Sequence, residues 1–229
     1  MILQAFIKGI TGEFKSSLSQ FLFLDSKEYH VFNNVIVQAS NGTTQIDHVI
    51  VSRYGIFVIE TKNRNGWIFG DYRSPKWTEK LYGKTYQFQN PLHQNYKHTK
   101  SLAEILKIDE RKLYPIIVFW GNCEFKTQMP ENVLKKGYID YIKSKIQILL
   151  TVEEIERISN QIISIKNNTP FFGGFQHTAS LKKRYESITV FPKCGANLVE
   201  RTSQTGVNKG TKFLGCSNFP RCSYKKSLN

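Results

Sequence analysis

Apolar and polar positions alternate most regularly along residues 45–62, which read QIDHVIVSRYGIFVIETK. The segments QIDHVIVS and IFVIETK are rich in β-branched residues and are separated by Arg53-Tyr54-Gly55, a pattern that predicts two strands joined by a tight turn. Because side chains alternate between the two faces of a strand, each segment should present one shared face. The residues expected there are Gln45, Asp47, Val49 and Val51 in the first strand and Ile56, Val58, Glu60 and Lys62 in the second.

The position of the turn sets which residues of the two strands lie opposite each other. A turn centred between positions 53 and 54 gives these pairs: Val51 with Ile56, Val49 with Val58, Asp47 with Glu60, and Gln45 with Lys62. Opposed side chains lie roughly 4.5–5.5 Å apart at Cβ, so two acids and a lysine would gather at the open end of the hairpin. Gly55 could instead impose a bulged three-residue loop, which shifts the register by one. The matched apolar pairs favour the unshifted register.

The remaining pattern predicts a mixed α/β sheet flanked by helices. Apolar residues at helical spacing indicate helices over residues 6–24, 91–107 and 151–165, and Thr151 with Glu154 forms a capping box at the start of the last one. Extended β-branched or apolar runs indicate strands over residues 28–38 and 113–121, with a further edge strand over 137–142. Residues 167–178 are rich in Gly and aromatic residues without periodicity, and we assign 167–186 to a linker.

Residues 63–90 carry turn signals at 65–66 and 82–84 between short aromatic segments, which predicts a meander of short strands over or beside the hairpin. Its aromatic side chains have two interpretations. They could stack on nucleic-acid bases, or they could form the core of the meander, which is the commoner role of aromatic residues in short strands. The residues concerned are Trp67, Tyr72, Trp77 and Tyr86.

The composition indicates a polyanionic partner. The chain has 229 residues, of which 40% are hydrophobic, and a formal net charge of +14. A charge of this size is typical of proteins that contact nucleic acid or an anionic membrane surface, and charge alone does not separate the two. The four cysteines, without a signal-like N-terminus or an apolar run of roughly 20 residues, predict a soluble cytoplasmic protein with reduced thiols.

The open end of the hairpin has the chemistry of a metal site. Asp47 and Glu60 would repel each other at this distance unless a cation lies between them, and one pKa would rise. Mg²⁺ favours one or two carboxylates together with water and phosphate oxygens. Lys62 would face the same ion, where it could orient or deprotonate an attacking water or stabilise charge on a phosphate. The alternative is an ordinary hairpin whose end carries solvated salt bridges.

The order Asp, then Glu-x-Lys on the next strand, resembles the PD-(D/E)xK nuclease signature. The longer string QIDHVIVSRYGIFVIETKNRNGWIFG closely resembles the nuclease-related domain (NERD) family. The resemblance covers about residues 10–125 and includes Gly12-Glu13 upstream and the string NPLHQN at 90–95. It implies a restriction-endonuclease-like fold over residues 1–166, with a helical extension over 140–166, and a nuclease that acts on DNA with Mg²⁺ or Mn²⁺.

The resemblance also implies roles for single residues. The acid of the Gly-Glu pair helps to bind metal in the family, which makes Glu13 a third metal ligand, although a glutamate near a helix start also complements the helix dipole. Gln94 lies where several related nucleases place a glutamine that touches substrate or the metal shell, and it could equally be structural. His93 and His98 are five residues apart, so they do not share a helical face and are expected to be surface or packing residues.

Positive charge is concentrated toward the C-terminus, where residues 171–229 contain ten Lys or Arg and two Glu. Within this segment, residues 187–229 resemble the four-cysteine zinc ribbon of bacterial type I topoisomerases, with the strings FLGCS and FP ahead of the last cysteine. Phe191 stands where the family has its first cysteine, which leaves three zinc ligands, Cys194, Cys216 and Cys222. Structural zinc sites are four-coordinate, so either His177 or Cys123 completes the site or the ribbon folds without zinc.

The ribbons that this segment resembles bind single-stranded DNA through basic and aromatic side chains. Stacking of a base on an aromatic ring is worth about 1–3 kcal/mol and tolerates any sequence. The aromatic rings could instead form the small core of the ribbon itself. The candidate DNA-binding residues are Arg201, Lys212, Phe213, Phe219, Arg221 and Tyr224.

These observations predict a Mg²⁺-dependent DNA nuclease with an appended basic DNA-binding ribbon, acting in DNA processing, repair or defence. Two other hypotheses fit the same sequence. One is a DNA-binding or repair-accessory protein that uses the nuclease fold as a platform without catalysis. The other is association with an anionic membrane through residues 1–10 and the basic tail.

Overall fold

The computed structural model describes residues 23–39, 42–168, 198–204, 210–217, 219 and 225–227. The chain divides into two compact units, Met1–Gly173 and Gly174–Asn229. This division falls inside the range 167–186 that we assigned to a linker, and the domain boundaries stay a prediction. The helix expected over residues 6–24 lies almost entirely outside the described residues.

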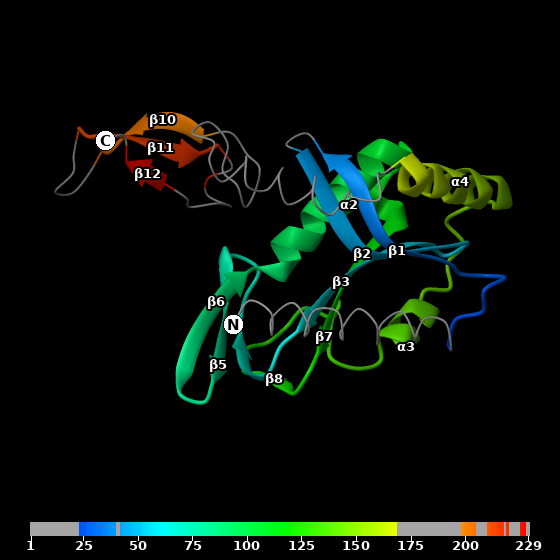
Figure 1. The fold of residues 1–229 in the computed structure, drawn as a ribbon, viewed down its shortest axis with the longest axis horizontal. Helices are drawn as coiled ribbons and strands as arrows, with labels where there is room; N and C mark the ends of the chain where they lie inside the picture. The colour runs from blue at the N-terminus through cyan, green and yellow to red at the C-terminus, as the bar shows by residue number, and fades with distance from the viewer. Residues whose placement is uncertain are drawn as a thin grey trace. The chain divides into compact units, whose positions relative to one another are not determined.

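The first unit is built on a five-stranded mixed sheet in the order β1-β2-β3-β7-β9 (Figure 1). The first three strands pair antiparallel, whereas β7 and β9 run parallel to their neighbours. The unit is therefore mixed α/β, as the sequence predicted. The strands are β1 (His30–Ala39), β2 (Gly42–Ser52), β3 (Gly55–Asn63), β7 (Leu113–Trp120) and β9 (Val133–Leu134).

The β2–β3 hairpin has the unshifted register. Val51 lies opposite Ile56 and Val49 lies opposite Val58, so the turn needs no bulge. The pairing ends at His48 and Ile59, one residue before the expected pair of acids. The sequence therefore predicted the apolar part of the register correctly, and the polar end departs from regular pairing.

The departure begins in β1 and β2, where the alternation of side chains reverses once. Ile46 and Val49 lie in the same buried cluster although they are three residues apart, and Val35 and Val37 of β1 lie there too. Asn34 has φ of 54°, and the β1–β2 pairing skips it together with Asp47, the residue across from it in β2. A residue in this left-handed conformation turns the strand out of its regular pleat.

This reversal corrects one sequence prediction. Gln45 was expected opposite Lys62, on the face of Val49, but the β2–β3 pairing ends at His48 and Ile59, and Ile46 instead shares the buried cluster of Val49. The amide nitrogen of Gln45 lies 3.2 Å from the side-chain oxygen of Asn34. The apolar Ile46 occupies the core-facing position in its place, because burying an isoleucine is favourable and burying an unpartnered amide is not.

Helices α2 (Pro91–Leu106) and α4 (Val152–Asn168) cover one face of the sheet, and α3 (Tyr138–Lys143) packs on the other. In Figure 1, α2 crosses beside β3. A single-turn 3-10 helix, Glu110–Lys112, leads from α2 into β7. Apolar clusters on both faces explain why β7 reads as a nearly continuous apolar run.

Two asparagines fix α2 in place. Asn90 caps the helix by accepting a hydrogen bond from the backbone of Leu92, and its amide donates to the carbonyls of Asp71 and Ser74. One turn further on, buried Asn95 donates to the carbonyls of Val58 in β3 and Ile116 in β7. The start of α2 is thereby tied to the same strand that carries the expected site residues.

Helix α4 begins with the predicted capping box. The Thr151 hydroxyl accepts from the backbone N–H of Glu154 at 3.2 Å, and the Glu154 carboxylate accepts from the backbone N–H of Thr151 at 3.0 Å. Ile158 and Ile162 of its apolar stripe are fully buried.

The edge strand predicted over residues 137–142 is wrong. This segment forms helix α3, and the edge of the sheet is the short strand β9. Tyr138 and Ile142 are four residues apart and both are buried, which is the spacing of one helical face. The β-branched residues of the segment suggested a strand, but this helical packing decides the outcome.

A second, four-stranded sheet in the order β6-β5-β4-β8 confirms the predicted meander. The residues of the loop between β5 and β6, Tyr82 and Gly83, both have positive φ, which suits a two-residue hairpin turn. Its aromatics divide: Trp77 is fully buried, whereas Trp67, Tyr72 and Tyr86 are exposed. The strands are β4 (Gly66–Phe69), β5 (Lys76–Leu81), β6 (Lys84–Gln89) and β8 (Cys123–Phe125).

The second unit contains a three-stranded antiparallel sheet in the order β10-β11-β12. Its strands are β10 (Leu198–Thr202), β11 (Lys212–Cys216) and β12 (Lys225–Ser227). Within the described residues of the whole chain, no helix has both the length and the apolar character required to cross a membrane.

Candidate active site

Asp47 lies where the β2–β3 pairing stops, and its side chain accepts the hydrogen bonds that β3 donates there. Its Oδ2 accepts hydrogen bonds from the backbone N–H and from the hydroxyl of Thr61, both at 2.7 Å. Both bonds use the same carboxylate oxygen, so Oδ1 has no protein donor among the described residues. The reversal of β2 at this residue therefore produces a carboxylate that is anchored through one oxygen and available through the other.

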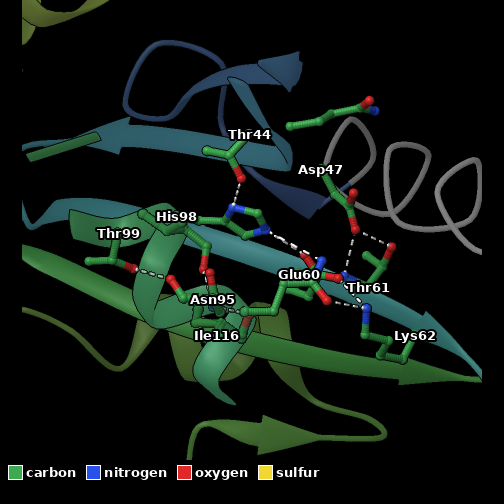
Figure 2. Close-up of polar contacts among 12 residues, drawn as sticks. Thr44, Asp47, Glu60, Thr61, Lys62, Asn95, His98, Thr99 and Ile116 are labelled. Atoms are coloured by element: carbon green, nitrogen blue, oxygen red, sulfur yellow. Dashed lines mark hydrogen bonds and ion pairs between the residues drawn. The ribbon is translucent and has the colours of Figure 1, made fainter. Parts of the chain in front are cut away.

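Glu60 is almost completely buried, with 2% of its surface exposed. One carboxylate oxygen accepts from the ammonium of Lys62, and the other lies 3.1 Å from Nε2 of His98. A buried carboxylate needs such partners, because an unpaired buried charge is strongly unfavourable. Figure 2 shows Asp47, Glu60 and Lys62 grouped around Thr61.

His98 connects Glu60 to strand β2. Its Nδ1 lies 2.9 Å from the hydroxyl of Thr44, and its Nε2 faces Glu60 (Figure 2). Since an ionised carboxylate only accepts, Nε2 must carry a hydrogen and donate it. In the neutral imidazole Nδ1 then accepts from the hydroxyl of Thr44. The three side chains form a buried chain of hydrogen bonds that orients Glu60.

Gln94, one turn ahead of His98 on α2, contacts Lys62. Its side-chain oxygen accepts from the Lys62 ammonium at 3.0 Å, and its nitrogen lies 3.5 Å from Nε2 of His98. Lys62 is thus held between Glu60 and Gln94, with 16% of its side chain exposed. The glutamine proposed from the family resemblance lies beside the lysine, and its catalytic role stays a proposal.

The two acids differ in their electrostatics. Burial would raise the pKa of Glu60, but the charge of Lys62 and the hydrogen bond from His98 outweigh it and lower the pKa to about 2. Burial, followed by the negative charge of Glu60, raises the pKa of Asp47 to about 7, against the opposing effect of the Thr61 hydrogen bonds. Lys62 and His98 together therefore outweigh burial at Glu60, whereas at Asp47 the charge of Lys62 is the smallest of the effects that oppose the rise in pKa.

His48 follows Asp47 in the sequence, but its side chain contacts strand β1. It is buried, and its Nδ1 lies 2.7 Å from the side-chain oxygen of Asn33 in β1. Burial lowers the pKa of His48 to about 4, so the ring is neutral at pH 7.

Sequence reasoning missed His98, Thr44 and Thr61. His98 was expected to be a surface or packing residue, yet it contacts the buried acid of the site directly. His93 instead forms a hydrogen bond with the Tyr72 carbonyl at the surface. The inference that the two histidines do not share a helical face is therefore confirmed. The only available signal was that Gln94 and His98 are four residues apart and share a helical face.

Glu13 lies outside the described residues. Within the described part of the chain, no three His, Cys, Asp or Glu side chains gather as a ready metal site. Asp47 and Glu60 therefore stand as two candidate ligands, and a third carboxylate stays a prediction.

In the ribbon, four candidate residues also lie outside the described residues, namely Cys194, Arg221, Cys222 and Tyr224. Cys216 is buried. Arg201 lies over the ring of Phe219 at 5.7 Å, and Lys212 is paired with Glu200 at 2.8 Å.

The alternatives left open for the ribbon are partly decided. Phe219 is 60% exposed, so its ring is not part of a small core, whereas Phe213 is half-buried. Cys123, one candidate for the fourth zinc ligand, is buried beside Ile68, Trp77 and Phe119 in the apolar core of the second sheet. An apolar environment raises the pKa of this thiol, which disfavours the thiolate that zinc requires.

Comparison with known proteins finds two family matches along the chain. Residues 8–120 match the family described as Nuclease-related domain, NERD, and residues 192–229 match the Topoisomerase DNA binding C4 zinc finger. An uncharacterized protein of Bacillus anthracis is 36% identical over 165 residues, which is 68% of this chain and 76% of that protein.

Among solved structures, one of a protein of unknown function, AF1548, is 15% identical and aligns with 76% of this chain and 99% of its own. Its TM-score is 0.27, too low to support any conclusion about the fold. The family match spans the whole of β2, β3, α2 and β7, and so includes Asp47, Glu60, Lys62 and Gln94. The chain belongs to the nuclease-related domain family and carries a topoisomerase-type zinc-ribbon segment at its C-terminal end.

Proposed function

We propose that the first unit is a nuclease domain of the PD-(D/E)xK type that hydrolyses phosphodiester bonds in DNA with a divalent cation. The observation that carries the proposal is the grouping of Asp47, Glu60 and Lys62 at the end of the β2–β3 pairing (Figure 2). Two carboxylates and a lysine on adjacent strands can hold a cation, a phosphate and a water in one place. Membership of the NERD family supports the same reading.

The side chains present fit Mg²⁺ or Mn²⁺. Oδ1 of Asp47 has no donor among the described residues, and Glu60 adds a second carboxylate. Both cations take oxygen ligands, and Mg²⁺ usually binds one or two carboxylates and several waters. Asp47 and Glu60, with Glu13 as a third carboxylate, would hold the ion. When bound, the ion would polarise the scissile phosphate and lower the pKa of an attacking water.

The protein side chains have separate tasks in this proposal. Lys62 is held by Glu60 and Gln94, so its ammonium points in a fixed direction and can orient the water or stabilise charge on the phosphate. His98 is a positioning residue, because it fixes the orientation of Glu60 through one hydrogen bond. Asp47, anchored on Thr61, presents its second oxygen without a change of backbone.

The test is DNA cleavage by the full chain. Linear, nicked, supercoiled and single-stranded DNA are incubated with Mg²⁺, with Mn²⁺ or with EDTA. Cleavage is expected with either cation and none with EDTA. Lys62→Ala should lower the cleavage rate about 100-fold or more, the usual cost of removing one group that stabilises transition-state charge.

Lys143→Ala is the matched control, because Lys143 is an exposed lysine on α3, which packs on the face of the sheet away from α2. It should cleave at the wild-type rate. Equal cleavage by Lys62→Ala, Asp47→Asn and the wild-type protein would remove the proposed mechanism.

A second candidate function rests on a different observation. Both oxygens of Glu60 already have protein partners, which suits a stable core as well as a metal site. A DNA-binding protein that uses this fold as a platform would bind DNA in a salt-sensitive manner and show no turnover with any cation. The cleavage assay, combined with a binding assay, separates the two.

The ribbon segment completes the proposal. The family that this segment matches is described as DNA-binding. We propose that Arg201, Lys212 and Phe219 contact DNA in this protein. We also propose that Cys194, Cys216 and Cys222 bind zinc together with a fourth ligand. A cytoplasmic location is a separate part of the proposal. Metal analysis of the purified full chain tests the zinc, with about one zinc ion per chain as the expected result.

A further inference from the structure

The second sheet of the first unit has one face whose side chains are largely exposed, on which no other helix or strand of the described residues packs. Side chains alternate along its strands, so that Ile68 and Trp77 point into the core while their neighbours point to solvent. We call the solvent side the aromatic–lysine face. It carries Trp67, Phe69, Lys76, Lys80 and Lys126, together with Glu124, which lies opposite Trp67.

The pairing of the strands places these residues next to one another. Trp67 of β4 lies directly opposite Lys80 of β5, and the Lys80 ammonium lies 5.3 Å from the centre of the Phe69 ring. The ammonium of Lys126, just beyond β8, lies 4.8 Å from the centre of the Trp67 ring. The two rings therefore adjoin Lys80 and Lys126, and Lys76 lies on the same side of β5, two positions before Thr78, the residue opposite Phe69.

Both the aromatic rings and the charge need explanation. Trp67 is 51% exposed, although burying a tryptophan is among the most favourable contributions to a core. The four strands contain two acids: Glu79 is buried on the opposite face with Arg64, and Glu124 is paired with Lys126 at 2.6 Å. Lys76 and Lys80 have no acid partner in these strands, so the face carries net positive charge.

We propose that the aromatic–lysine face binds single-stranded DNA, with unpaired bases stacked on Trp67 and Phe69 and phosphates paired with Lys76, Lys80 and Lys126. Flat rings within a basic surface are the features that bind single strands without sequence preference. Duplex DNA hides the faces of its bases, so it cannot use the rings in this way. The inference rests on the proposed function only for the choice of DNA as the polyanion.

The location of this face suits a path toward the candidate active site. Strand β4 follows β3 after two residues, and Trp67 is five residues beyond Lys62. Five extended residues span at most about 18 Å. A short single strand bound on the face can therefore reach the lysine of the site.

Tryptophan fluorescence provides a local test. The chain has three tryptophans: Trp77 is fully buried, Trp120 is half-buried, and Trp67 is exposed. All three lie in the first unit, so binding to the ribbon alone gives no signal from a stacked tryptophan. The full chain carrying Lys62→Ala is titrated with oligothymidylate in EDTA, which prevents cleavage.

Quenching of the tryptophan emission is expected, and it should disappear in Trp67→Ala. Phe69→Ala retains the reporter and should raise the Kd of quenching about fivefold or more, which is the lower end of the stacking contribution for one base. The double variant Lys76→Ala/Lys80→Ala should reduce the slope of log K against log salt by about 1.4, since each phosphate contact on a single strand contributes about 0.7.

The matched control is Lys136→Ala/Lys143→Ala, which removes two exposed lysines outside this sheet and should leave the slope unchanged. Quenching that persists in Trp67→Ala, or that is equally strong with duplex DNA, would overturn the proposal. DNA cleavage without Trp67-dependent quenching would refute this face and leave the nuclease intact. Trp67-dependent quenching without DNA cleavage would support this face and refute the proposed nuclease.

Discussion

At the scale of single residues, Asp47 combines a structural and a chemical role. Its Oδ2 replaces a backbone acceptor for the N–H of Thr61 at the point where β2 and β3 stop pairing. Its Oδ1 has no donor in the part of the chain that the structure describes, and is therefore the atom that we expect to bind a ligand. The two roles depend on different atoms, so a substitution can remove one and keep the other.

Asp47→Asn separates these roles. The amide oxygen can still accept from Thr61, so the free energy of unfolding should change by less than about 1 kcal/mol. The loss of the negative charge should abolish metal-dependent cleavage. Urea unfolding and the cleavage assay measure the two effects.

Asp47→Ala is the comparison, because it also removes the acceptor for Thr61 and should destabilise the protein by about 1–3 kcal/mol. An active Asp47→Asn protein would contradict the role of this carboxylate as a metal ligand.

His98 holds the buried Glu60 in one orientation. His98→Ala removes the donor to Glu60 and the partner of Thr44, both buried, and should destabilise the protein by about 1–3 kcal/mol. For cleavage, we expect a lower kcat with a nearly unchanged KM, since His98 acts through Glu60 and does not touch the substrate.

His98→Gln should recover part of kcat, because its amide can donate to Glu60, whereas His93→Ala, at a half-buried position that bonds to the Tyr72 carbonyl, should cleave as the wild type does. A larger effect on KM than on kcat would show that His98 contacts the substrate instead.

At the scale of elements, the capping box holds the start of α4, which covers the same face of the sheet as α2. Thr151→Ala should lower the free energy of unfolding by about 1 kcal/mol, the usual contribution of an N-cap side chain. Ser164→Ala, at an exposed position within α4, should have an effect of at most about 0.5 kcal/mol. Thermal or urea unfolding measures both, and equal stabilities of the two variants would contradict the capping role.

The same box predicts a dependence on pH. Hydrogen bonds from Lys112 and from the Thr151 backbone lower the pKa of Glu154 in the folded protein. A lowered folded pKa stabilises the protein above the unfolded pKa of about 4.3, and this contribution is lost as the pH falls through the folded pKa. The stability difference between wild type and Glu154→Gln should therefore be present at pH 7 and vanish in acid. A difference that is constant with pH would contradict this linkage.

At the scale of the whole molecule, the chain has two units, and positive charge is concentrated in residues 171–229. Arg201 of β10 pairs with Phe213 of β11, and Lys212 pairs with Thr202 in the next position of the same two strands. Arg201→Ala/Lys212→Ala should reduce the salt slope for binding of single-stranded DNA by at most about 1.4. The amplitude of Trp67 quenching should not change, because that signal comes from the first unit. An unchanged slope would exclude these two residues as phosphate contacts.

The sequence by itself determined the features that depend on neighbours along the chain. The β2–β3 register near the turn, the strand β7, the helix α2 and the capping box of α4 all follow from local periodicity and turn chemistry. Such features can be predicted because residues two, three or four positions apart decide them. The resemblance to the family motif predicted Asp47, Glu60 and Lys62 as site residues, and the structure brings these three side chains together.

Only the tertiary structure decided how this group of residues is completed. His98 contacts Glu60 from 38 positions away, and Thr44 contacts His98 from 54 positions away. The reversal at Asn34 and the helix α3 likewise follow from packing against distant elements and not from local pattern. A buried carboxylate must find donors wherever the fold brings them, and that requirement is met by contacts in space, which periodicity along the sequence does not record.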